Sequence, residues 1–92
     1  MKGSEFKAIR SFNKLKLIDI AKELNFKSHR VILEIEKYDN VPIRFINALS
    51  TILKVDLTKE EIYKNMLIGI PDKYFKGRNR KQILKYNIFK FE

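Results

Sequence analysis

Short stretches of helical periodicity, each ended by an abrupt turn, are the feature that most constrains the fold of this chain. The clearest is a stripe at i, i+3, i+4, i+7 spacing formed by Leu17, Ile20, Ala21 and Leu24. Asn25 follows directly, and asparagine is the best non-glycine residue for the left-handed conformation that ends many helices. The pattern predicts a helix of only two turns, followed by a tight turn.

Four further segments have the same character. Ser4 is placed to cap a first helix, Ser28 to cap a third, and Pro42 to open a fourth. Thr58 followed by Glu61 has the spacing of a capping box for a fifth helix. Their apolar sides are Phe6 and Ile9; Ile32 and Ile35 with Val31 beside them; Ile46, Leu49 and Leu53; and Ile62, Tyr63 and Met66. No strand is visible before residue 67, so the sequence predicts an all-α fold of five helices.

Composition excludes several classes of protein. A chain of 92 residues with 45% apolar residues has enough for one packed core and too little for two. It has no cysteine and one histidine, His29, so neither a disulfide nor a metal cluster is expected. The apolar runs are too short to span a membrane, and the N-terminus does not resemble a secretory signal, which predicts a cytoplasmic protein.

Catalytic motifs are missing from the sequence as well. There is no glycine-rich phosphate loop, no cysteine nucleophile and no Ser-His-Asp set. We therefore expect neither an enzyme nor a bound cofactor or metal.

The charge is strongly positive and unevenly distributed. The net charge is +9, with a sequence pI of about 9.9, which is typical of small nucleic-acid-binding domains. An AT-rich genome also produces such a composition, because its codons favour lysine, isoleucine and asparagine. Residues 73–91 carry seven basic and no acidic side chains, whereas residues 1–72 carry thirteen basic against ten acidic.

The second and third predicted helices together have the pattern of a helix-turn-helix. Ala21 is small, so the two helices can cross closely, and Ile32 and Ile35 can anchor the second of them. The polar residues at the start of that second helix then remain free to reach base edges in the major groove of DNA.

At these positions the chain resembles the Cro/phage-repressor (XRE-type) helix-turn-helix family over about residues 5–66. The matching residues are Ile9-Arg10, Leu15, Ile20-Ala21, Leu24, Ser28, Ile32, Ile35-Glu36, Val41-Pro42, Ile46, Leu49 and Leu53. The resemblance implies a five-helix, lambda-repressor-like domain at residues 1–67. It also implies a structural ion pair between Arg10 and Glu36.

The same resemblance implies a function. Such a protein is a sequence-specific binder of double-stranded DNA, acting as a transcriptional repressor or autoregulator of phage, plasmid or bacterial origin. Members of the family usually bind inverted repeats as homodimers, which implies a homodimer here and a place at the nucleoid.

The candidate DNA-binding residues follow from this match. Ser28, His29 and Arg30 are expected at base edges, and Leu33 against a thymine methyl group or a partner protein. Contacts to the DNA backbone are expected from residues before the second helix, in the turn and around the fourth helix: Lys16, Lys27, Asn40 and Arg44.

The chain departs from the family at three places. The turn Asn25-Phe26-Lys27 is one residue longer than usual, and Lys16-Leu17 stands where the family has Ser-Gln. Leu33 and Glu34 replace polar or basic residues, and a glutamate that faces phosphates weakens binding by like-charge repulsion.

Residues 68–92 form a basic, aromatic C-terminal extension, whose stretch 83–91 fits a β-arm or a short helix. Its apolar residues Tyr86, Ile88, Phe89 and Phe91 favour an arm that packs on another surface over a purely electrostatic tail. The alternative function is therefore an antitoxin or phage-encoded protein-interaction module, which keeps the helix-turn-helix scaffold and binds a protein partner through residues 73–92.

Overall fold

The computed structural model describes residues 1–75, and this part of the chain is all-α, with five α-helices and no strand. The elements are α1 (Gly3–Phe12), α2 (Leu17–Glu23), α3 (Arg30–Ile35), α4 (Ile43–Leu53), α5 (Glu60–Ile68) and the 3-10 helix η1 (Asp72–Tyr74). The prediction of an all-α chain with five helices is confirmed for these residues.

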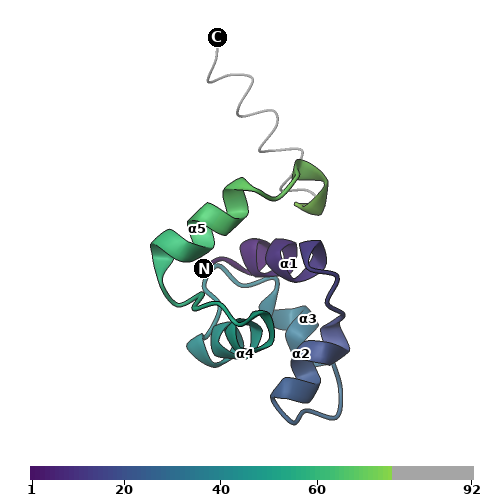
Figure 1. Cartoon of the computed structure of the whole chain (residues 1–92). Helices are drawn as coiled ribbons and strands as arrows, with labels where there is room; N and C mark the ends of the chain where they lie inside the picture. The colour runs from purple at the N-terminus through teal and green to yellow at the C-terminus, as the bar shows by residue number, and fades with distance from the viewer. Residues whose placement is uncertain (76–92) are drawn as a thin grey trace.

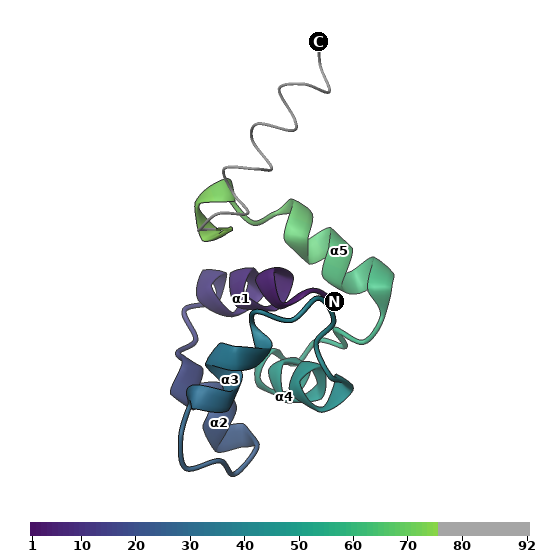
Figure 2. The same cartoon turned by 180° about the vertical axis from the view of Figure 1, so that it is seen from behind.

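Helix α1 lies in the middle of the molecule (Figure 1), and the view from behind shows the same order (Figure 2). Helix α5 and η1 lie on one side of α1 and both contact it. Helices α2, α3 and α4 lie on its other side, where α2 contacts both α3 and α4. The connection between α2 and α3 is therefore on the side of α1 that faces away from α5.

One hydrophobic core joins the first four helices. Its largest fully buried side chains are Phe6 and Ile9 of α1, Ile20 of α2, Ile32 of α3, Leu49 of α4, and Leu57. Helix α5 has no fully buried residue and packs against this core with half-buried side chains, among them Ile62 and Met66. The apolar stripes in the sequence thus identify the inward faces of these helices, with the exception of Val31 on α3.

The start of α1 differs from the prediction. Ser4 is not its N-cap, because the helix begins at Gly3 and the Glu5 carboxylate accepts a hydrogen bond from the Lys2 backbone N–H at 2.8 Å. The Gly3 N–H donates to the Tyr38 carbonyl at 2.8 Å. These two bonds satisfy the backbone N–H groups of Lys2 and Gly3, where the helix begins.

The starts of α4 and α5 also lie slightly later than predicted. Pro42 precedes α4 instead of opening it, with φ −58° and ψ 145°. The capping box at Thr58 is wrong, since α5 begins at Glu60. Both the backbone N–H and the hydroxyl of Thr58 donate to the Asp56 carboxylate instead, which forms a turn before the helix.

The connection between α2 and α3 follows the prediction closely. Asn25 has φ 61°, as expected for the residue that ends α2, and Ala21 is fully buried. Ser28 was expected to cap α3, and this prediction is wrong by one position, because the N-cap is His29 and has no side-chain cap. The Ser28 hydroxyl accepts a hydrogen bond from the N–H of Arg30, the first residue of the helix, at 3.1 Å.

Packing continues beyond residue 67, where the sequence placed the domain boundary. Ile70 is buried, and the Tyr74 ring meets the Phe12 ring edge to face, with centroids 5.3 Å apart. The predictions for the stretch 83–91 and for the basic, apolar arm lie outside the described residues. No helix within residues 1–75 is long and apolar enough to cross a membrane.

Candidate nucleic-acid interface

Helix α3 has one buried and one exposed side. Ile32 and Ile35 are buried against the core, while Arg30, Leu33 and Glu34 are exposed. Val31 was expected beside the buried pair, and this expectation is wrong, because 43% of its surface is exposed. With only six residues, α3 buries two side chains and leaves the others for external contacts.

Four consecutive polar residues lead into this exposed side. Lys27, Ser28, His29 and Arg30 are all exposed. No ion pair within the described part of the chain involves Lys27 or Arg30. Their charged groups are therefore open to solvent at the start of α3.

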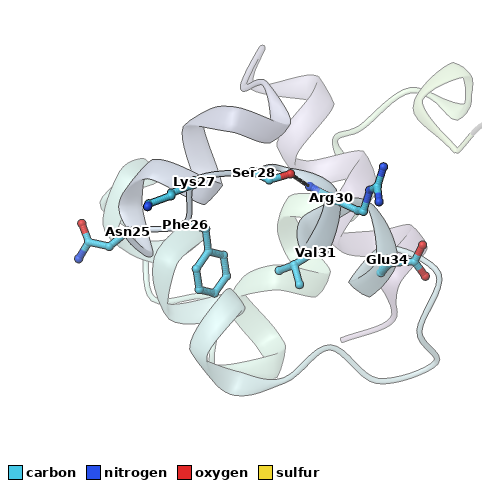
Figure 3. A pocket seen from close by; sticks show the side chains of 7 residues that line it. All are labelled: Asn25, Phe26, Lys27, Ser28, Arg30, Val31 and Glu34. Carbon is cyan, nitrogen blue, oxygen red and sulfur yellow. Dashed lines mark hydrogen bonds between the residues drawn. The ribbon is translucent and has the colours of Figure 1, made fainter.

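An open hollow of about 750 Å³ lies beside this segment (Figure 3). We call it the α2–α3 hollow; it is lined by Asn25, Phe26, Lys27, Ser28, Arg30, Val31 and Glu34. In Figure 3 the Phe26 ring and the Val31 side chain extend into the same space, while Asn25 and Lys27 extend outward. The hollow thus combines an apolar floor with a polar, mostly cationic edge.

Arg44, near the start of α4, joins the hollow through Phe26. Its guanidinium carbon lies 5.1 Å from the Phe26 ring centroid and 5.6 Å from that of Phe45. The two rings are themselves in contact, with centroids 6.2 Å apart and planes tilted by 55°. Both distances from Arg44 are within the range of cation–π interactions.

The structure brings four of the eight candidate residues together: Lys27, Ser28 and Arg30 line the hollow, and Arg44 reaches it over Phe26. The other four are exposed but do not line it: Lys16, His29, Leu33 and Asn40.

Lys16 and Asn40 lie outside the helices. Lys16 precedes α2, where its backbone N–H donates to Asp19 at 2.7 Å. Asn40 lies in the connection between α3 and α4.

Sequence reasoning missed Phe26 and Val31 as lining residues. Phe26 belongs to the turn that the resemblance makes one residue longer than usual. An aromatic residue in an otherwise polar turn indicates a packing contact, which here is with Phe45.

Glu34 was noted in the sequence as an unfavourable charge. In the structure it lines the hollow and lies 3.7 Å from the Lys37 ammonium group, with both groups exposed.

The predicted ion pair between Arg10 and Glu36 is confirmed. Arg10 Nε donates to Glu36 Oε2 at 2.6 Å, and Nη2 donates to Oε1 at 3.2 Å. Arg10 Nη1 donates to the Leu15 carbonyl at 2.8 Å, and both charged side chains are buried. The pair ties α1 to the end of α3 and so fixes the direction in which the exposed side of α3 faces.

The described residues bring no three His, Cys, Asp or Glu side chains together in a way that could hold a metal ion. The chemistry of the surface around the hollow is that of exposed cations, a carboxylate and apolar groups.

Comparisons with known proteins return no relative. No family model, no curated protein and no solved structure matches the chain.

Proposed function

We propose that this chain is a sequence-specific double-stranded DNA-binding protein of the Cro/phage-repressor type, in which α2 and α3 form a helix-turn-helix. The observation that carries the proposal is the start of α3. There, exposed Ser28, His29 and Arg30 precede a helix whose other side, Ile32 and Ile35, is buried. A helix presented in this way fits the major groove, which is about 12 Å wide.

The Arg10–Glu36 pair supports the resemblance on which the proposal rests. The resemblance implies an ion pair between Arg10 and Glu36, which are 26 positions apart in the sequence. In the structure their side chains are joined by two hydrogen bonds. A chance match of two charged residues gives no reason for them to be buried together.

The roles of the surface residues follow from their chemistry. Arg30 can donate two hydrogen bonds to O6 and N7 of guanine, and Val31 can contact a thymine methyl group. The phosphate backbone, which positions the protein without reading sequence, is the proposed partner of four exposed residues: Lys16, Lys27, Asn40 and Arg44. The regulatory role is that of a small repressor or autoregulator in the cytoplasm, bound as a homodimer to an inverted repeat.

A selection experiment tests the proposal. The full chain is incubated with a pool of random duplex DNA, bound duplexes are amplified over several rounds, and light scattering gives the mass of the protein with and without the selected DNA. We expect enrichment of an inverted repeat and a complex that contains two chains per duplex. Binding of equal strength to every sequence, or no binding, would overturn the proposal.

A second candidate is a protein-interaction module, and exposed apolar side chains favour it. Val31 and Leu33 of α3 are each 43% exposed, Tyr38 after α3 is 48% exposed, and Ile43 at the start of α4 is 58% exposed. Apolar groups of this kind are more typical of a surface that meets a protein than of one that meets phosphates.

Removing residues 76–92 tests the role of the C-terminal extension within either candidate function. The cut at residue 76 leaves Tyr74 on Phe12 and so spares the packing of the described part. If the basic residues of the extension lie along phosphates, the truncated chain binds every DNA sequence more weakly. Its log–log salt slope then falls by roughly 0.9 for each phosphate that the protein no longer neutralises. If the extension is an interaction arm, which we expect, self-association or stability falls and the salt slope per bound subunit is unchanged.

A further inference from the structure

Arg44 is held in an unusual way for an exposed arginine. Its guanidinium carbon lies over the Phe26 ring, 5.1 Å from the centroid, and 5.6 Å from the centroid of the Phe45 ring. Phe26 contacts Phe45, which is buried in the core. The charged group is therefore supported through two aromatic rings by the interior of the protein. This support joins α4 to the connection between α2 and α3.

The stacking leaves the hydrogen-bonding capacity of Arg44 unused. A cation–π contact places the cation over the face of an aromatic ring, and the guanidinium carries five N–H donors. No hydrogen bond or ion pair among the described residues takes any of these side-chain donors. The backbone N–H groups of Ile43 and Arg44, in the first turn of α4, have no partner there either.

A phosphate group is the ligand that fits this arrangement. Its oxygens accept two parallel hydrogen bonds from the edge of a guanidinium, and its negative charge is favoured near the positive end of a helix such as α4. Lys27 and Arg30 lie on the edge of the same hollow, so the surroundings are mainly cationic, with Glu34 as the carboxylate.

We propose that Phe26 is a positioning residue that holds Arg44 for contact with a phosphate group of the DNA backbone beside α3. The inference rests on the proposed DNA-binding function and deepens it. An unsupported arginine must lose much of its side-chain freedom on binding, whereas Arg44 has lost part of it already in the free protein. Phe26, in the turn between α2 and α3, supplies the ring that makes this possible.

A double-mutant cycle tests the coupling between the two residues. The variants are Phe26→Leu, Arg44→Gln and the double variant, with dissociation constants measured by fluorescence anisotropy on one duplex at several salt concentrations. We expect Arg44→Gln to weaken binding about tenfold and to lower the salt slope by about 0.9. Phe26→Leu should weaken binding about twofold to fivefold, and should have no further effect once Arg44 is glutamine.

Further variants control for folding and for charge. Phe26→Tyr keeps the aromatic face and should bind as the unaltered protein does, and thermal unfolding shows whether each variant is folded. Phe12→Leu removes an exposed ring that contacts Tyr74, and Lys64→Gln removes a charge on α5, on the far side of α1. Neither of these two variants should change DNA binding by as much as twofold.

The outcomes distinguish the inference from the proposed function. If the unaltered protein binds no duplex, the proposed function fails, and the inference fails with it. If it binds but Phe26→Leu has the same effect with glutamine at position 44 as with arginine, DNA binding stands and the positioning role is refuted. If a glutamate-rich peptide binds as tightly as the duplex and depends equally on Arg44, the ligand is a protein carboxylate and the phosphate contact is wrong.

Discussion

Arg10 and Arg44 are the same residue type in two opposite situations. The guanidinium of Arg10 is buried, and its N–H groups donate to both carboxylate oxygens of Glu36 and to the Leu15 carbonyl. The guanidinium of Arg44 is exposed and rests on Phe26, and its donors have no partner among the described residues. A buried charge that is paired and makes three hydrogen bonds fixes geometry, whereas a supported charge with free donors is available to a ligand.

Arg10 contacts the end of the short helix α3, whereas Arg44 contacts the connection that precedes this helix. The pair of Arg10 and Glu36 holds the end of α3. At its start, beside the hollow that Phe26 lines, the Ser28 hydroxyl accepts a hydrogen bond from the first N–H of the helix. A helix of six residues has little stability of its own, since isolated helices shorter than about 12 residues are marginal in water. Its orientation therefore depends on these contacts at both ends.

The largest effect is expected from breaking the buried pair. Glu36→Ala leaves the Arg10 charge buried without its carboxylate, which should lower the free energy of unfolding by about 3–5 kcal/mol. Urea unfolding followed by circular dichroism measures the change. Glu34→Ala is the matched control, because its pair with Lys37 is exposed and should contribute only about 0–1 kcal/mol.

The double variant Arg10→Met, Glu36→Leu sharpens this result. Apolar side chains of similar volume remove both charges at once, and such replacements are often neutral or stabilising. A double variant as unstable as Glu36→Ala alone would mean that packing, not the unpaired charge, causes the loss.

The next largest effect on stability is expected at Gly3, where the backbone of α1 lies against the backbone at the end of α3. A Cβ on Gly3 would lie 2.4 Å from the Glu36 carbonyl oxygen and 2.7 Å from that of Ile35. Since both contacts are to backbone, Gly3→Ala must push α1 away from the end of α3, and we expect a loss of about 1–3 kcal/mol in unfolding experiments. Gly69→Ala serves as the control, because its Cβ would meet only the Met66 carbonyl at an ordinary 3.6 Å.

The sequence predicts the first of these two regions better than the second. The Arg10–Glu36 pair follows from a resemblance and is present. In the second region only the left-handed Asn25 follows from residue type. The stacking of Arg44 on Phe26 was not predicted, because it depends on where α4 passes the α2–α3 connection. That relation is set by packing between helices, which periodicity within one helix does not describe.

The errors in the helix starts have a related cause. Ser4 and Thr58 are good capping residues by type, yet Glu5 and Asp56 provide the carboxylates that accept the nearby N–H groups. When two capping residues lie within a few positions of each other, the tertiary contacts decide where the helix begins. At α1, the bond from the Gly3 N–H to the Tyr38 carbonyl is such a contact.

Substitution of an exposed residue that lines the hollow should weaken DNA binding and leave the free energy of unfolding nearly unaltered. Arg30→Ala removes an exposed charge at the start of α3, so the unfolding free energy should change by less than about 0.5 kcal/mol. On a selected operator, binding should weaken by about 1–3 kcal/mol, and specificity should relax at one base pair. Lys64→Ala on α5 removes the same charge and should leave specificity intact. If the Arg30 variant keeps both affinity and specificity, the residues assigned to base edges are wrong.

The smallest effect is expected from Asp56. Its carboxylate is exposed, as the guanidinium of Arg44 is, but it accepts hydrogen bonds from a neighbouring residue, as Glu36 does from Arg10. Hydrogen bonds from the Thr58 hydroxyl and backbone N–H hold the pKa of Asp56 below its ordinary value of 3.8. A carboxyl with a lowered pKa in the folded state stabilises the protein above the pKa of the unfolded chain. This contribution is lost as the pH falls below 3.8 and through the folded-state value.

Thr58→Val keeps the backbone bond and removes the hydroxyl, so it should raise the pKa of Asp56 towards its ordinary value. Below about pH 5, the free energy of unfolding of the variant should therefore fall less with decreasing pH than that of the unaltered protein. The reason is that the ionised Asp56 stabilises the variant less to begin with. Carboxyl chemical shifts in an NMR titration measure the pKa directly, and thermal unfolding at each pH measures the stability. Because Asp56 is fully exposed, water screens the interaction and the difference should be small beside that of Glu36→Ala. A pKa of Asp56 that is the same with threonine or valine at position 58 would show that the hydroxyl contact does not stabilise this carboxylate.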